Sequence, residues 1–150
     1  MSAADQIFRV FIENEAGSST KNTYDEKTLQ RLGSAEVARP YPFPYGFVLD
    51  TLSGDGDCVD CFVVTDKALH SGEVVDCVPV HLLEQIEDGD VDHKVVCVLA
   101  GVPDVVSESA VETIRAFVTS VFSHIPGKTI ELGLLLGPTE AVRYVRECSV

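Results

Sequence analysis

The chain has 150 residues, a length that suits a single domain over residues 1–150. Its 11 Lys and Arg residues against 24 Asp and Glu residues give a net charge of −13, which argues against nucleic acid as a partner because phosphate contacts need a positive surface. The acidic residues instead face solvent over the surface or gather in a cation-binding site, and only the positions of the carboxylates can distinguish the two cases.

The sequence gives no sign of a membrane partner or of export. Its longest stretch without a charged residue, 117–127, is shorter than the roughly 18 apolar residues that suggest a membrane helix. Residues 1–6 lack the basic and apolar regions of a signal peptide. The five cysteines, an odd number, are expected to be free thiols in a reducing compartment, which predicts a cytoplasmic location.

Short β-strand patterns dominate the first two thirds of the chain. Between them, a polar hairpin is expected over 21–32 and a proline-rich extended surface segment over 39–46. Runs rich in β-branched and aromatic residues predict strands at 7–13, 47–52, 59–65, 74–80 and 94–99.

Two helices are expected after the strands. From Ser107 onwards, apolar residues recur every three or four positions, which predicts a long helix that Ser107 or Ser109 caps. Pro126 and Gly127 are expected to end this helix, with His124 in its last turn. A shorter helix is expected over 140–148. Together the patterns predict an α+β fold in which a β-barrel packs against a helix.

The most informative stretch is Asp55-Gly-Asp-Cys-Val-Asp60, in which three carboxylates fall within six residues. On a regular strand Asp60 would point away from Asp55 and Asp57, but the neighbouring glycines allow a bend that brings all three together. Two carboxylates about 4 Å apart repel each other by roughly 4 kcal/mol at an effective dielectric constant near 20. They therefore either spread into water or hold a divalent cation, and oxygen ligands favour Mg²⁺, Mn²⁺ or Ca²⁺ over Zn²⁺.

A second acidic cluster runs from Glu87 to Lys94. It is not an EF-hand: counted from Asp88, position six is His93 instead of Gly and position twelve is Leu99 instead of Glu. Taken alone, each of the two clusters is also typical of a solvated acidic turn, because Asp and Gly commonly build turns.

The remaining motifs indicate structure and not chemistry. Cys58 and Cys61 have the spacing of a redox or zinc-binding pair, but no helix follows them and no second pair completes a zinc site. Cys77 and Cys97 lie in apolar runs and are expected in the core. The segment 127–129 lacks the first glycine of a phosphate-binding loop and is expected to form a turn.

The acidic motif 55–60 follows a segment rich in tyrosine and proline, Tyr41-Pro-Phe-Pro-Tyr-Gly-Phe47. This order resembles the core signature of the family I soluble inorganic pyrophosphatases, in which a Tyr-Pro-x-x-Tyr-Gly segment precedes an Asp-x-Asp-x-x-Asp motif. The resemblance extends from about residue 8 to 124. It implies a small closed β-barrel of the OB kind with flanking helices, and metal-dependent hydrolysis of pyrophosphate by direct attack of water.

The resemblance also implies a role for each matching residue. The implied ligands for Mg²⁺, with Mn²⁺ as a substitute, are Asp55, Asp60, Asp92 and Glu87, with Asp88 as an alternative to Glu87. Asp57 matches the carboxylate that deprotonates the attacking water. The implied phosphate-binding residues are Lys21, Arg31, Tyr45 and Lys94, with Arg39 as an alternative to Arg31; Glu13 matches an outer acidic residue of the site.

Two departures from the family pattern lie near this constellation. Thr23 stands where the family has Glu, and Ile125-Pro126 stands where it has a Tyr-Lys pair that binds phosphate. The candidates to replace the lost groups are Lys128, Arg143 and Arg146. The chain is therefore expected to be a divergent, short member with reduced activity, acting on pyrophosphate and forming a homo-oligomer. Two alternatives stay open: a catalytically impaired relative with a binding or regulatory role, and an interaction module whose acids only face solvent.

Overall fold

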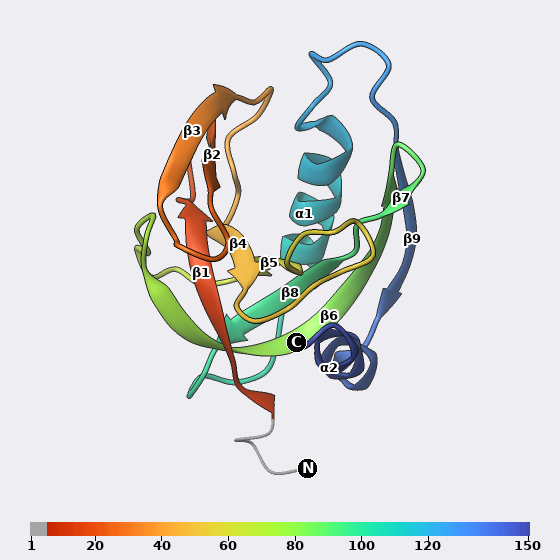
Figure 1. Ribbon diagram of the computed structural model, residues 1–150. Helices are drawn as coiled ribbons and strands as arrows, with labels where there is room; N and C mark the ends of the chain where they lie inside the picture. Colours follow the sequence, from red (N-terminus) through yellow and green to blue (C-terminus); the bar gives the residue numbers. More distant parts are fainter. Residues whose placement is uncertain (1–5) are drawn as a thin grey trace.

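Five strands close into a small barrel. The computed structural model describes residues 6–150 and gives the strand order β1-β4-β5-β8-β6 (Figure 1). The barrel closes because β1 pairs with β4 along one edge and with β6 along the other, so neither edge of β1 is left open. The five strands are β1 (Phe8–Asn14), β4 (Tyr45–Val48), β5 (Asp60–Val63), β6 (Val74–Glu87) and β8 (Lys94–Leu99).

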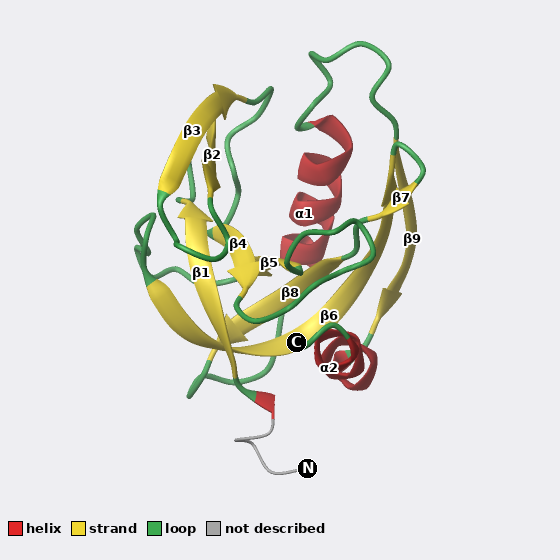
Figure 2. Cartoon of the chain, in the orientation of Figure 1, coloured by secondary structure: helices red, strands yellow, loops and turns green. Residues whose placement is uncertain are grey.

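The other elements are attached to this barrel. A separate hairpin stands beside it, and two further strands pair with β6 (Figure 2). The hairpin consists of β2 (Thr20–Tyr24) and β3 (Arg31–Glu36), and the two further strands are β7 (Asp90–Val91) and β9 (Ile130–Leu136). The two helices are α1 (Glu108–Ser120) and α2 (Pro138–Glu147).

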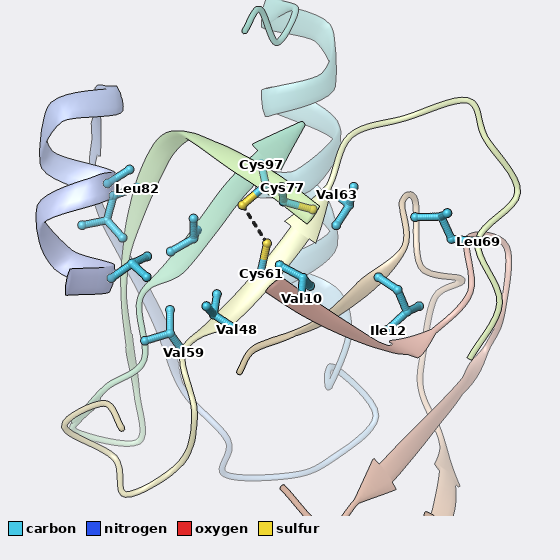
Figure 3. Packing of buried hydrophobic residues seen from close by; sticks show 13 residues of the cluster. Val10, Ile12, Val48, Val59, Cys61, Val63, Leu69, Cys77, Leu82 and Cys97 are labelled. Atoms are coloured by element: carbon cyan, nitrogen blue, oxygen red, sulfur yellow. Dashed lines mark hydrogen bonds between the residues drawn. The ribbon is translucent and has the colours of Figure 1, made fainter. Parts of the chain in front are cut away.

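The central strands bury both of their faces, one in each of two hydrophobic clusters. On β5, Cys61 and Val63 belong to the cluster drawn in Figure 3, which also contains Ala141 and Val145 of α2. Phe62, between them, points the other way and packs in a cluster with α1. This alternation follows from the two-residue period of a strand. It matters for function because Asp60 shares the Phe62 face and so points towards the side that α1 covers.

Several elements agree with the sequence predictions. The first strand, the polar hairpin and the strand at 94–99 are present, and the α+β barrel with two helices is confirmed. Ser107 is the residue that caps α1, because its side chain accepts a hydrogen bond from the backbone N–H of Ala110 at 3.1 Å. Cys77 and Cys97 are buried as expected, and the Sγ atoms of Cys61 and Cys97 lie 3.0 Å apart in the core (Figure 3).

Other elements have different bounds. The segment expected on the surface over 39–46 is instead partly buried, because Tyr41 and Tyr45 pack in the cluster under α1. The strand expected over 47–52 ends at Val48, where the chain turns through Asp50 with a φ of 59°. The strand expected over 74–80 continues to Glu87, because a shift in register just after Pro79 accommodates the missing N–H. The long helix ends at Ser120, so His124 and Pro126 lie in the loop beyond it. Strand β9 was not expected, since its leucines and glycine are weak strand formers and its pairing with β6 is distant in sequence.

Residues 1–5, on which most of the expectation about a signal peptide rests, lie outside the described residues. Within residues 6–150, no helix has the length and apolar character needed to cross a membrane.

The contact between β1 and β4 generates a prediction about Gly46. A Cβ atom at Gly46 would lie 1.7 Å from the backbone oxygen of Phe11, an overlap that only a shift of the paired strands can relieve. We expect Gly46→Ala to lower the free energy of unfolding by about 3 kcal/mol or more. Denaturant unfolding checks this value, with Gly33→Ala of β3 as the matched control because a Cβ there meets no atom within 4 Å. Equal stability of the two variants would contradict the predicted clash.

Candidate active site

A cleft of about 450 Å³ lies where the β2–β3 hairpin, α1 and the central strands meet. Nine of the ten residues that the sequence analysis selected line it, although they come from six separate segments of the chain. These nine are Glu13, Lys21, Tyr45, Asp55, Asp57, Asp60, Glu87, Asp92 and Lys94. The tenth, Arg31, is exposed on β3 and does not line the cleft, and its alternative Arg39 is also exposed outside it.

The Lys94 ammonium group is the centre of the site. The parallel pairing of β5 and β8 sets Asp60 beside Lys94, and Asp92 lies two residues before Lys94. The Lys94 Nζ atom is 2.7 Å from Asp60 Oδ2 and 3.0 Å from Asp92 Oδ2. It also donates a hydrogen bond of 3.1 Å to the hydroxyl of Tyr45. Lys94 and Asp92 are only 6% and 8% exposed, so these contacts are made largely out of water.

The protonation of this trio follows from burial and mutual attraction. Burial lowers the pKa of Lys94, but the nearby carboxylates, with Asp60 foremost, raise it more, so the pKa lies well above its usual value. Burial raises the pKa of Asp60, but the Lys94 ammonium outweighs it and the net pKa is lowered. For Asp92, burial and the neighbouring Asp60 raise the pKa to about 8. Lys94 and Asp60 are therefore a charged pair, while Asp92 takes up a proton more readily than an ordinary aspartate when no metal ion is bound.

A group of three carboxylates could hold a metal ion. One carboxylate oxygen from each of Asp55, Asp60 and Asp92 lies within 4.8 Å of the other two. All donors are hard oxygens, a set that suits Mg²⁺, Mn²⁺ or Ca²⁺. The Lys94 ammonium already contacts two of the three carboxylates, so a metal ion held there shares Asp60 and Asp92 with Lys94.

The loop before β5 brings Asp55 to this group. Gly56 has a φ of 88°, a left-handed conformation that glycine adopts without strain, and the turn is closed by a hydrogen bond of 2.7 Å from Ser53 N to Asp57 O. The side chain of Asp55 accepts a hydrogen bond of 3.0 Å from Asp57 N and another from the Ser53 hydroxyl. The bend that the glycines were expected to allow is therefore present.

Asp57 and Glu13 lie in the same cleft with raised pKa values. For Asp57, partial burial, Asp55 and Asp60 all raise the pKa, which makes its carboxylate a better proton acceptor. For Glu13 the pKa is raised to about 8, chiefly by burial and then by Asp60.

Several cleft residues were not selected from the sequence. Examples are Glu26, Tyr41, Gln85 and Phe122. The Glu26 carboxylate accepts the backbone N–H of Cys58 at 3.1 and 3.2 Å, which ties the tip of the β2–β3 hairpin to the acidic loop. The two residues are 32 positions apart, so no local pattern could have linked them. The signal available for Tyr41 was its place in the Tyr-Pro-rich segment 41–47.

Comparison with known proteins agrees with this arrangement. The sequence profile described as inorganic pyrophosphatase matches residues 10–148. The chain belongs to the inorganic pyrophosphatase family. An inorganic pyrophosphatase from Synechocystis sp. is 38% identical over 101 residues, which cover 65% of this chain and 59% of that protein. One from Nanoarchaeum equitans is 29% identical over 148 residues, covering 91% and 92% of the two chains.

The fold is shared with solved structures of the family. The inorganic pyrophosphatase from Thermus thermophilus, 27% identical, has a TM-score of 0.86 and is matched over 99% of this chain and 92% of that one. Against the Synechocystis pyrophosphatase, by contrast, the aligned segment spans less than two thirds of that relative's length. Membership of the pyrophosphatase family and the barrel fold, both expected from the sequence, are thus confirmed.

The two departures from the pyrophosphatase pattern have clear positions. Thr23 lines the cleft, and Ile125 is exposed in the loop after α1. Lys128, three residues further on, lies beside Glu87 with 3.7 Å between its Nζ atom and Glu87 Oε1.

The raised pKa of Glu13 generates a prediction about pH. Because folding raises this pKa from 4.5 to about 8, the folded chain holds a proton that the unfolded chain releases between these values. Stability therefore falls as the pH rises through this window. We expect Glu13→Gln to remove this loss, so that the variant gains a few kcal/mol over the native chain between pH 5 and pH 8.

Urea unfolding with EDTA at the two pH values measures the effect. The exposed Glu36→Gln of β3 is the matched control. If the free energy of unfolding changed between pH 5 and pH 8 by the same amount in Glu13→Gln, in Glu36→Gln and in the native chain, Glu13 would not be the group that titrates.

Proposed function

We propose that this chain hydrolyses inorganic pyrophosphate to two phosphates with the help of Mg²⁺, for which Mn²⁺ can substitute. The observation that carries the proposal is the convergence of the carboxylates of Asp55, Asp60 and Asp92, the last two of which also contact the buried Lys94 ammonium. Membership of the inorganic pyrophosphatase family supports the choice of substrate. The remaining cleft residues supply the donors and the base that the reaction needs.

In this proposal Asp55, Asp60 and Asp92 hold a divalent cation, and Glu87 at the rim contributes a further carboxylate. A divalent cation there supplies positive charge for the pyrophosphate oxygens and lowers the pKa of a water molecule towards neutrality. The donor set fits, because carboxylate oxygens are the ligands that Mg²⁺ and Mn²⁺ prefer.

The phosphate oxygens are bound by Lys21, Tyr45 and Lys94. Burial raises the pKa of Tyr45 well above its usual value, so its hydroxyl keeps its proton and can donate it in a hydrogen bond. Lys94 remains charged, as its raised pKa requires, and stabilises the negative charge that develops on the leaving phosphate.

Asp57 takes the proton of the attacking water. The water oxygen forms a bond to one phosphorus atom while the bond from that phosphorus to the bridging oxygen breaks, and the second phosphate leaves with that oxygen. No covalent intermediate with the protein is needed, and the raised pKa of Asp57 suits a proton acceptor.

A second candidate function is a pyrophosphate-binding protein with impaired catalysis. It is favoured by Thr23, which lines the cleft without a carboxylate, and by the position of Arg31 outside the cleft. The two functions differ in turnover and not in binding, so a hydrolysis assay separates them.

The proposed setting is the cytoplasm, and the proposed assembly is a homo-oligomer. Five free cysteines, four of them buried, support a reducing compartment. Exposed apolar side chains such as Leu134 on β9 support association between copies.

Two asparagine variants test the proposed roles through phosphate release and Mg²⁺ binding. We expect the native chain to release phosphate from pyrophosphate with Mg²⁺ and not with excess EDTA. Asp57→Asn keeps the shape of the side chain without its basicity, so turnover at saturating Mg²⁺ should fall by about 10²–10⁴-fold with Mg²⁺ affinity little changed. Asp60→Asn should instead weaken Mg²⁺ binding by at least about tenfold.

Absence of hydrolysis by the native chain with every divalent metal, together with retained pyrophosphate binding, would favour the second candidate. Equal loss of Mg²⁺ affinity in both variants, with turnover intact at saturating Mg²⁺, would mean that the roles are assigned wrongly.

A further inference from the structure

We propose that Lys128 and Lys21 form a pair of ammonium groups that binds phosphate oxygens at the rim of the cleft, with Lys128 as a substrate-binding residue. This inference rests on the proposed function and deepens it, since pyrophosphate is the anion concerned. It starts from the segment between α1 and β9, which comes down beside the β6–β7 turn (Figure 1).

The backbone next to Lys128 is fixed to that turn. Thr129 N donates a hydrogen bond of 2.8 Å to Asp88 Oδ1, and Asp88 N donates one of 2.9 Å to Thr129 O. Gly127, with a φ of 82°, makes the preceding turn in a left-handed conformation that glycine favours. The side chain of Lys128 therefore starts from an anchored backbone and is only 25% exposed.

Both lysines contact the same aromatic ring. The Nζ atom of Lys128 is 4.7 Å from the centroid of Phe122, and that of Lys21 is 5.2 Å from it. Phe122 and Lys21 line the cleft, so the ring brings the ammonium group of Lys128 to the cleft margin. A cation over an aromatic face is held by the electrons of the ring and not by hydrogen-bond acceptors.

The N–H groups of Lys128 remain available to a ligand. Its carboxylate neighbours, Glu87 Oε1 at 3.7 Å and Asp88 Oδ2 at 3.8 Å, are close enough to attract the charge. Both distances exceed the 2.7–3.2 Å range of a hydrogen bond. A phosphate oxygen can therefore accept short, charge-assisted hydrogen bonds from these N–H groups.

The charge balance of the cleft gives such a group a function. Eight carboxyl groups line the cleft, and those that are ionised repel a highly anionic substrate. Of the two lysines that line it, Lys94 is already paired with Asp60 and Asp92. Lys21 makes no ion pair with any described residue within 4.0 Å, so Lys21 and Lys128 offer N–H donors to phosphate oxygens, whereas Lys94 shares its donors with its two carboxylates.

The rival explanation is that Lys128 only links its loop to Glu87 and Asp88. The two explanations predict different results for Lys128→Ala. If Lys128 is only a structural link, the variant loses stability and binds every ligand more weakly. If Lys128 binds substrate, the variant binds the anion alone more weakly. Mg²⁺ without the anion then binds equally well or more tightly, since a positive charge beside Glu87 is removed.

The experiment compares Lys128→Ala, Lys128→Arg and Lys67→Ala with the native chain. Lys67 is an exposed lysine outside the cleft, so its variant carries the same change of charge. Calorimetry measures the binding of Mg²⁺ alone and of methylenediphosphonate, a pyrophosphate analogue that is not hydrolysed, at saturating Mg²⁺. Denaturant unfolding and the KM for pyrophosphate complete the comparison.

For Lys128→Ala we expect analogue affinity to fall, and KM to rise, by about tenfold or more, which is the effect of one charge-assisted hydrogen bond. Mg²⁺ affinity should be unchanged or higher, kcat should change less than KM, and Lys128→Arg should recover most of the loss. Analogue affinity equal to that of Lys67→Ala, or a parallel loss of Mg²⁺ affinity and stability, would overturn the inference.

These results are separable from the test of the proposed function. A native chain that binds the analogue through Lys128 but releases no phosphate upholds the inference and removes the proposed hydrolysis. A native chain that hydrolyses pyrophosphate with Lys128→Ala unaffected does the reverse.

Discussion

The rest of the site depends on the contacts that the buried Lys94 ammonium makes with Asp60 and Asp92. Removing a charged group from water costs several kcal/mol unless partners compensate for the lost hydration, and here Asp60 and Asp92 lie 2.7 and 3.0 Å away. The three residues must therefore occur together. Their convergence requires the parallel pairing of β5 with β8 in a register that sets Asp60 beside Lys94. A slip by one residue would send one partner to the opposite face of the sheet.

The barrel and α1 maintain this arrangement by excluding water from one side. Tyr45 from β4 packs between Tyr41 and Phe62, with ring centroids 5.3 and 4.8 Å away, and Phe117 of α1 packs against Tyr41 at 4.7 Å. These rings border the cleft, and in their apolar surroundings the attraction between Lys94 and its carboxylates is stronger than it would be in water. The same burial keeps the Tyr45 hydroxyl protonated and raises the pKa of Asp92.

The sequence predicted the centre of the site better than its margins, for a physical reason. Asp55, Asp60, Asp92 and Lys94 lie in short motifs next to strand patterns, so local spacing and the family resemblance were enough to select them. The contact of Glu26 with Cys58 and the anchoring of Thr129 to Asp88 join segments 32 and 41 residues apart. Strand β9 likewise depends on its pairing with β6 and not on its own residues. Arg31 had the right residue type, but the exposed β3 holds it outside the cleft.

Anomalous diffraction from crystals grown with Mn²⁺ tests the central claim most directly. If the carboxylates of Asp55, Asp60 and Asp92 bind a divalent cation, as we propose, an anomalous peak lies between these three side chains in the native protein. In Asp60→Asn the peak is weaker or absent at the same Mn²⁺ concentration. No peak at this position under saturating Mn²⁺, or one equally strong in Asp60→Asn, would contradict the proposed metal site.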